Sequence, residues 1–138
     1  EWGTTVAGEM LKPTRIYVRP VLSLMRKIRI RSMAHVTGGG ISGNVPRTLP
    51  DGVTAVIEKG TWPVLPVFGT IVRAARLPEE EAYRTFNMGI GMVLSVRAAD
   101  AERSVRHLKR SGEAAYIIGE VRRGRRGAPQ VRLTGVKS

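Results

Sequence analysis

The chain has 138 residues, of which 42% are hydrophobic, and this is enough to build one core of ordinary size. It lacks cysteine, which excludes disulfides and thiolate metal sites, and its two histidines argue against a histidine-rich metal cage. The formal net charge of +12 favours phosphate-bearing partners, and no segment has the ~18–20 apolar residues of a membrane span or the pattern of a secretory signal.

The first half of the chain predicts two helices and two strands. Apolar residues recur at helical spacing over residues 16–28, where Pro13 and Thr14 mark an expected helix start. Pro20 is expected to kink or delay this helix. The elements that follow are a buried strand over residues 32–36, a short helix over residues 42–49 and a strand over residues 53–57.

The second half predicts alternating helices and strands. Pro78, followed by three glutamates at residues 79–81, is a helix N-terminus signature, because acids favour the positive end of the helix dipole. The other expected elements are a helix over residues 63–76, a strand over 92–96, a basic helix over 100–110 that ends at Gly112, a strand over 114–121, and a turn over 122–127 from which residues 130–133 close a hairpin. This order indicates an α+β (mixed α/β) fold, with a mixed sheet of about four to six strands covered by helices on one face.

Three consecutive glycines at residues 38–40 directly follow the strand that contains His35. Glycines cost chain entropy, so such a loop usually needs its backbone amides close to a ligand, most often a phosphate. Thr37, Ser42 and Asn44 would add neutral donors. The guanidinium of Arg47 suits a phosphate. A tight strand–helix turn that simply requires glycine is the alternative, but three glycines beside a histidine favour the binding interpretation.

The same glycines imitate a dinucleotide-binding fingerprint, since Gly38, Gly40 and Gly43 satisfy the spacing G-x-G-x-x-G. Pro46 and Pro50 leave too few residues for the helix that such a unit packs on its sheet. We therefore reject this interpretation.

The two histidines receive different predictions. His35 lies at the edge of the glycine loop, and a side chain that exchanges protons near neutral pH suits acid–base catalysis or phosphate binding there. A half-buried histidine bonded to backbone is the alternative for His35. His107 lies on a basic helix, and we expect it to be solvated surface.

A second candidate segment covers residues 83–91. Asn87 lies between a helix and a strand, where its side-chain amide could contact a ligand. Gly89 and Gly91 fall on one face of the strand entry and would let a ligand or another backbone approach. A bulge with close helix packing is the alternative, and these residues alone leave both interpretations open.

Arginines flank Gly124 in the expected turn near the C-terminus, at residues 122, 123, 125 and 126. They could form a nucleic-acid patch or simply a solvated turn. Aromatic residues make up 5% of the chain and none interleave with these arginines, so we favour the solvated turn.

Three motifs together resemble the phosphoribosylformylglycinamidine cyclo-ligase (aminoimidazole ribonucleotide synthetase) family. They are Lys-Pro-Thr-Arg-Ile-Tyr-Val at residues 12–18, His-Val-Thr-Gly-Gly-Gly at residues 35–40 with Asn44, Pro-Arg and Leu-Pro after it, and Tyr-Arg-Thr-Phe-Asn-Met-Gly-Ile-Gly-Met at residues 83–92. Their order and spacing agree with the family, and the resemblance covers nearly the whole chain.

The resemblance implies an ATP-dependent cyclo-ligase of de novo purine biosynthesis, which converts formylglycinamidine ribonucleotide to aminoimidazole ribonucleotide with release of ADP and phosphate. In that family ATP activates the formyl amide oxygen, the amidine nitrogen attacks, and phosphate leaves. The resemblance also implies a cytoplasmic homodimer of two-domain chains, in which the N-terminal domain holds most of the ATP and Mg²⁺.

By the same resemblance and the loop chemistry, His35 would be catalytic. The residues expected to bind substrate or phosphate are Thr37, Gly38, Gly39, Gly40, Asn44, Arg47, Asn87 and Gly89. We expect no metal ligand in this chain and no membrane partner. Residues 1–138 would form one C-terminal domain without its N-terminal ATP-binding domain, so the chain alone would be inactive, an expectation that fits a sequence starting at Glu1.

Three other functions stay open at the level of sequence. A related ATP-using domain could share the architecture, and a basic nucleic-acid-binding module would account for the net charge, although we do not expect a nucleic-acid partner. A stand-alone phosphate or nucleotide sensor would bind its ligand without a second domain.

Overall fold

The computed structural model describes residue 3 and residues 5–135, and within them the chain forms five strands in two sheets together with six α-helices. In chain order the elements are α1 (Val6–Met10), α2 (Val18–Met25), β1 (Ser32–His35), α3 (Gly40–Asn44), the 3-10 helix η1 (Pro46–Thr48), β2 (Val53–Glu58), α4 (Pro66–Ala75), α5 (Glu79–Thr85), β3 (Met92–Ser95), the 3-10 helix η2 (Ala98–Asp100), α6 (Ala101–Arg110), β4 (Gly119–Arg123) and β5 (Val131–Thr134). The predicted mixed α/β class is confirmed.

The five strands divide between a three-stranded and a two-stranded sheet. In the larger sheet β2 lies between β4 and β5, antiparallel to β4 and parallel to β5. In the smaller sheet β1 pairs with β3 in antiparallel register, so that His35 lies opposite Met92. The central position suits β2, because its residues Ala55, Val56 and Ile57 are all buried, whereas every residue of β4 is exposed.

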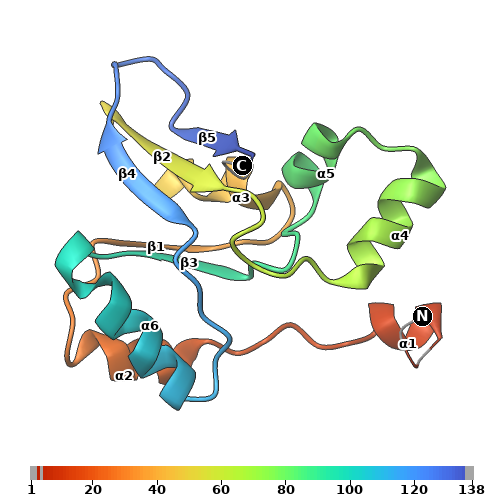
Figure 1. Cartoon of the computed structure of the whole chain (residues 1–138), viewed down its shortest axis with the longest axis horizontal. Coiled ribbons are helices and arrows are strands. Elements are labelled where there is room, and N and C mark those ends of the chain that lie inside the picture. Colours follow the sequence, from red (N-terminus) through yellow and green to blue (C-terminus); the bar gives the residue numbers. More distant parts are fainter. Residues whose placement is uncertain (1–2, 4, 136–138) are drawn as a thin grey trace.

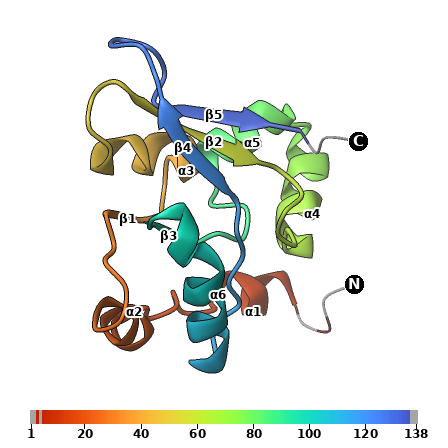
Figure 2. The same ribbon diagram turned by 60° about the vertical axis from the view of Figure 1, so that its left-hand side comes forward.

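The two sheets and a pair of helices form successive layers. Figures 1 and 2 show the three-stranded sheet at the top, the β1–β3 ribbon below it, and α2 packed against α6 at the bottom. Helices α3 and α5 contact each other and contribute to the same core as β2. Within the described residues, no helix is long and apolar enough to span a membrane.

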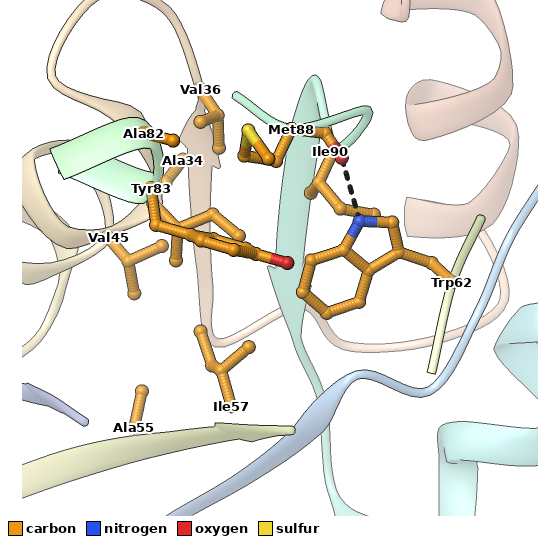
Figure 3. Close-up of a cluster of buried hydrophobic side chains, with 11 residues drawn as sticks. Ala34, Val36, Val45, Ala55, Ile57, Trp62, Ala82, Tyr83, Met88 and Ile90 are labelled. Atoms are coloured by element: carbon orange, nitrogen blue, oxygen red, sulfur yellow. Dashed lines mark hydrogen bonds between the residues drawn. The ribbon is translucent and has the colours of Figure 1, made fainter. Parts of the chain in front are cut away.

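The core lies between β2, the β1–β3 ribbon and helices α3 and α5 (Figure 3). Its buried members are Ala34, Val36, Ile41, Val45, Ala55, Ile57, Trp62, Ala82, Tyr83, Met88 and Ile90. The rings of Trp62 and Tyr83 meet edge to face with centroids 6.4 Å apart, a favoured aromatic geometry. The indole nitrogen of Trp62 donates a hydrogen bond of 2.9 Å to the carbonyl of Met88, so this large side chain is buried without an orphaned donor.

Several element boundaries differ from the prediction. The predicted C-terminal hairpin is wrong, because β2 lies between β4 and β5, so that β4 and β5 do not pair with each other. Helix α2 begins at Val18 rather than at Thr14, and Pro20 occupies its first turn, where a helix needs no amide donor. Strand β4 begins at Gly119 rather than at residue 114. The predicted N-terminus of α5 is confirmed, with Pro78 at its N-cap and acids in its first turn.

Candidate functional site

The three sequence motifs meet at one end of the β1–β3 ribbon. The amide of Val36 donates a hydrogen bond of 2.9 Å to the carbonyl of Gly91, which joins the second motif to the third. A side-chain carbon placed on Gly40 would lie 2.2 Å from the carbonyl oxygen of Tyr83, so these two motifs also touch there. A carbon on Gly91 would lie 2.1 Å from the hydroxyl of Tyr17, in the first motif.

His35 stands exposed at this junction, at the end of β1. Its ring meets the ring of Tyr17 edge to face, with centroids 6.0 Å apart and planes at 68°. Tyr17 can take this place because Gly91 leaves the space open. Burial raises the pKa of the Tyr17 hydroxyl, which nearby Arg15 opposes and Glu113 reinforces, so the phenol stays protonated at neutral pH.

Sequence reasoning did not single out Tyr17 as a site residue. The available signal was its place in the first motif, where it follows Arg15 and Ile16. Its packing on His35 depends on a third motif more than 70 residues away, and helical periodicity carries no information about such a contact. Tyr17 therefore joins His35 as a candidate for positioning a ligand.

The glycine loop leaves two backbone amides free. The amide of Gly40 donates to the carbonyl of Thr37 at 3.1 Å, so that amide is used inside the loop. Within the described part of the chain, the amides of Gly38 and Gly39 donate no hydrogen bond, and both residues are exposed, as is Thr37. Two exposed amide donors beside an exposed hydroxyl can donate hydrogen bonds to an anionic oxygen.

Gly40 is a glycine for a different reason. It is buried, with a φ of +58°, and its missing side chain makes room for the carbonyls of Tyr83 and Phe86. The structural alternative, a turn that simply requires glycine, therefore accounts for Gly40, which lets α3 lie directly against the end of α5. A direct contact between Gly40 and a ligand stays a prediction.

Asn44 holds the loop from inside. It is only 7% exposed, and its side-chain nitrogen donates to the carbonyls of Gly38 at 3.1 Å and Gly40 at 2.8 Å. Because both bonds fix the curvature of the loop, Asn44 positions the amides of Gly38 and Gly39. The contact of Asn44 with substrate stays a prediction, and its amide nitrogen is already used by the loop.

The turn before β3 is similarly fixed from within. The side-chain oxygen of Asn87 accepts from the amide of Gly89 at 3.0 Å, and Met88 and Gly89 both have positive φ, at +49° and +95°. Trp62 anchors the turn through the carbonyl of Met88. Gly89 is exposed, and the side-chain nitrogen of Asn87 donates no hydrogen bond within the described residues. This nitrogen is the group of Asn87 that a ligand could use.

Arg47 lies on η1, directly after α3, and is exposed. No described group forms an ion pair or hydrogen bond with it. Its binding role stays a prediction.

The prediction for His107 is wrong. Its side chain is only 8% exposed, on the face of α6 that packs against α2, and its Nε2 lies 3.0 Å from the hydroxyl of Ser23. Burial lowers the pKa of His107, and the charges of Lys27, Arg110 and Arg26 lower it further. A buried, hydrogen-bonded imidazole is thus part of the α2–α6 contact.

A wide hollow of about 760 Å³ lies over the three-stranded sheet and is separate from most of the predicted site. Among residues 35–47, which include the glycine loop, only Ser42 lines this hollow. Arg122 and Arg123 line it as well, and Arg122 pairs with Glu120, which raises the pKa of that guanidinium above its ordinary value. Within the described ranges, no three side chains of His, Cys, Asp or Glu come together as a metal site would require.

The chain is similar in sequence to several named proteins. The chain is 47% identical over 127 residues to a protein of Caldicellulosiruptor saccharolyticus named phosphoribosylformylglycinamidine cyclo-ligase, with 92% of this chain and 37% of the relative covered. Proteins of the same name are 46% identical over 128 residues in Cupriavidus metallidurans, covering 93% and 37%, and 48% identical over 119 residues in Acetivibrio thermocellus, covering 86% and 35%. The chain thus spans little more than a third of the length of these relatives.

The fold also resembles a solved structure. The crystal structure of E. coli HypE superposes with a TM-score of 0.62 at 22% identity, covering 95% of this chain and 41% of that one, and this likeness concerns the fold alone. A family model for the C-terminal domain of AIR synthase related proteins matches residues 3–132. The chain therefore belongs to the family of AIR synthase related proteins and represents their C-terminal domain.

Proposed function

We propose that this chain is the C-terminal part of an ATP-dependent cyclo-ligase that converts formylglycinamidine ribonucleotide to aminoimidazole ribonucleotide in purine biosynthesis. One observation carries the proposal: the exposed amides of Gly38 and Gly39 are without partners in the described residues and lie in the segment directly after His35, where three motifs of the cyclo-ligase relatives meet. The names of those relatives and the motifs point to the same reaction.

In this proposal each group has a chemical task. The amides of Gly38 and Gly39, with the hydroxyl of Thr37, bind phosphate oxygens of the nucleotide substrates. ATP supplies the phosphoryl group that activates the formyl oxygen as a leaving group. His35 accepts the proton that the amidine nitrogen loses as the new carbon–nitrogen bond forms and phosphate departs. Tyr17 packs on His35 and fixes the orientation of its ring.

The proposal assigns ATP and Mg²⁺ mainly to a second, N-terminal domain, of the kind that would fill the rest of the relatives' length. The apolar face of α2 supports such a partner. Val18, Leu22 and Met25 recur at helical spacing and are 60%, 51% and 46% exposed, whereas Leu24 on the opposite face is fully buried. An apolar stripe of this kind usually marks a contact surface. The whole enzyme would be a cytoplasmic homodimer.

A chimera tests the proposed function. We would replace the matching C-terminal third of the Caldicellulosiruptor saccharolyticus relative with this chain and measure ADP release from ATP, Mg²⁺ and formylglycinamidine ribonucleotide. The chimera should turn over, and His35→Ala should lower turnover by about 10²–10⁴-fold, as expected for loss of a general base, while the thermal midpoint changes little. Arg106→Ala, at an exposed position of α6, is the matched control and should keep activity.

A folded chimera without ADP release would contradict the assignment of the reaction. A turnover that His35→Ala leaves intact would contradict the role of His35 alone and keep the rest of the proposal.

A further inference from the structure

A second hollow lies between the C-terminal end of α2 and helix α6. It has a volume of about 360 Å³ and is lined by Lys27, Ile28, Arg103, His107 and Arg110. Three of these five side chains are cations, one is an imidazole and none is an acid. None belongs to the site of the proposed function.

The charges around this hollow are not balanced by acids. Asp100 pairs with Arg97 at 2.8 Å and with Arg103 at 3.2 Å, so one carboxylate serves two guanidiniums. Arg103 also donates to the carbonyl of Lys27 at 3.2 Å, which ties α6 to the end of α2 across the hollow. Lys27 and Arg110 have no acidic partner among the described residues. An excess of positive charge is therefore held in one place.

The pKa of His107, in the contact between α2 and α6, reflects this positive potential. Burial lowers its pKa first, and Lys27, Arg110 and Arg26 lower it further, because a protonated imidazole would add one more positive charge. The hydroxyl of Ser23 on α2 holds the Nε2 atom in place at 3.0 Å. Proximity of several cations costs electrostatic energy, and a bound anion would offset that cost.

We propose that this hollow is a binding site for a small, multiply charged phosphate anion, such as pyrophosphate or the phosphate chain of a nucleotide. Arg103 and Arg110 offer planar donors that match phosphate oxygens, and Lys27 offers a point charge. The volume lies at the lower end of the range for small-molecule sites, so it suits a phosphate chain more than a polymer. A bound anion would favour the protonated form of His107 and couple phosphate binding to proton uptake.

Nuclear magnetic resonance on the full 138-residue chain tests this proposal, because the sequence contains only two histidines. Pyrophosphate at low ionic strength should move the titration of the His107 ring to higher pH. Adenosine triphosphate should do the same, because its phosphate chain is the recognised group. An unchanged His107 titration with both ligands would overturn the proposal, as would a response to ATP alone.

Charge variants locate the site. Lys27→Gln and Arg110→Gln keep most of the aliphatic stem and should each weaken pyrophosphate binding about tenfold or more, as expected for loss of a charged hydrogen bond. Arg106→Gln is the matched control, since it is on the same helix but does not line the hollow. Far-ultraviolet circular dichroism checks that each variant folds. Equal weakening by Arg106→Gln would show diffuse attraction and overturn the proposal.

A competition experiment separates the anion site from a nucleic-acid surface. A short single-stranded oligonucleotide should be displaced by pyrophosphate from the Lys27 and Arg110 region and should bind no more tightly than ATP. Tight oligonucleotide binding that pyrophosphate does not displace, and that Arg110→Gln does not weaken, would overturn the proposal in favour of a broad polyanion surface.

Discussion

Gly38, Gly39 and Gly40 are adjacent in the chain, but the structure places them in three different surroundings. Gly38 has open space where a side chain would be, Gly39 has a φ of +91° at the start of α3, and Gly40 packs against the backbone of α5. The sequence could predict a loop with free amides but could not tell which amides remain free. That distinction depends on Asn44 and on the contact with α5, both of which are tertiary features.

Two alanine substitutions separate these roles. Gly40→Ala places a carbon 2.2 Å from the carbonyl oxygen of Tyr83 at a positive φ, so we expect a loss of about 2–5 kcal/mol in unfolding free energy. Gly38→Ala meets nothing within 4 Å and should cost less than about 1 kcal/mol. Urea unfolding of both variants measures the difference. Similar losses in the two variants would contradict the close contact at Gly40.

The lowered pKa of His107 makes stability depend on pH in a defined direction. Its folded-state pKa lies below the ordinary value of 6.5, so the unfolded chain binds more protons in the window just below that value. The His107 contribution is therefore fully present above about pH 6.5 and decreases as the pH falls through that window. Urea unfolding at several pH values should show a smaller decrease for His107→Gln than for the parent chain. An identical pH profile in the two proteins would refute this burial effect.

At the scale of elements, local signals predicted most helices and strands but not how the strands pair. Charge and proline signals placed α5 and α6 correctly, because dipole and capping effects act within one turn. The hairpin failed because a turn with Gly124 and Gly127 shows only that the chain reverses. Whether another strand lies between β4 and β5 depends on the apolar strand β2, which is far away in the sequence.

The error at His107 has a similar origin. Helix α6 carries charges on most sides, and its net polarity suggested a solvated helix. Ser104 and His107, spaced by three residues, are buried against α2. The available signal for a buried face was that Ser104 and His107 are uncharged or weakly basic and lie one helical turn apart. The many cations around them made this signal weak.

The turn between α5 and β3 depends on one side chain from another part of the chain. Trp62→Phe keeps an aromatic ring in the core but removes the hydrogen bond to the carbonyl of Met88. We expect a loss of about 1–3 kcal/mol, because that buried carbonyl loses its donor. Hydrogen exchange should accelerate most at the amides of Gly89 and Ile90, and little in α6. Uniform acceleration across the chain would show that the effect is global.

At the scale of the whole molecule, the chain presents an apolar stripe on α2 on one side and a basic hollow between α2 and α6 on the other side of the same helix. The relatives are nearly three times as long as the matched region, so the stripe has a natural partner in the proposed N-terminal domain. The family model fits this division, because it describes a C-terminal domain.

Leu22→Glu tests that partner surface. Leu22 is half exposed, so the substitution should change the stability of the chain itself by no more than about 0.5 kcal/mol. It should nevertheless reduce association with a separately produced N-terminal domain of a relative, measured by co-elution in gel filtration. Val121→Glu, which introduces the same charge at a half-exposed apolar position on β4, is the charge-matched control. Unchanged co-elution of Leu22→Glu would place the contact elsewhere.

The position of β2 in the middle of its sheet has a consequence for how the chain is made. Its neighbours come from the last part of the sequence, and the hydroxyl of Thr134 bonds to the carbonyl of Ile57 across 77 residues. During synthesis, β2 leaves the ribosome long before either flanking strand exists. Its apolar segment Ala55–Ile57 cannot form its native strand pairs until β4 and β5 have been synthesised, which leaves it open to non-native contacts in the meantime.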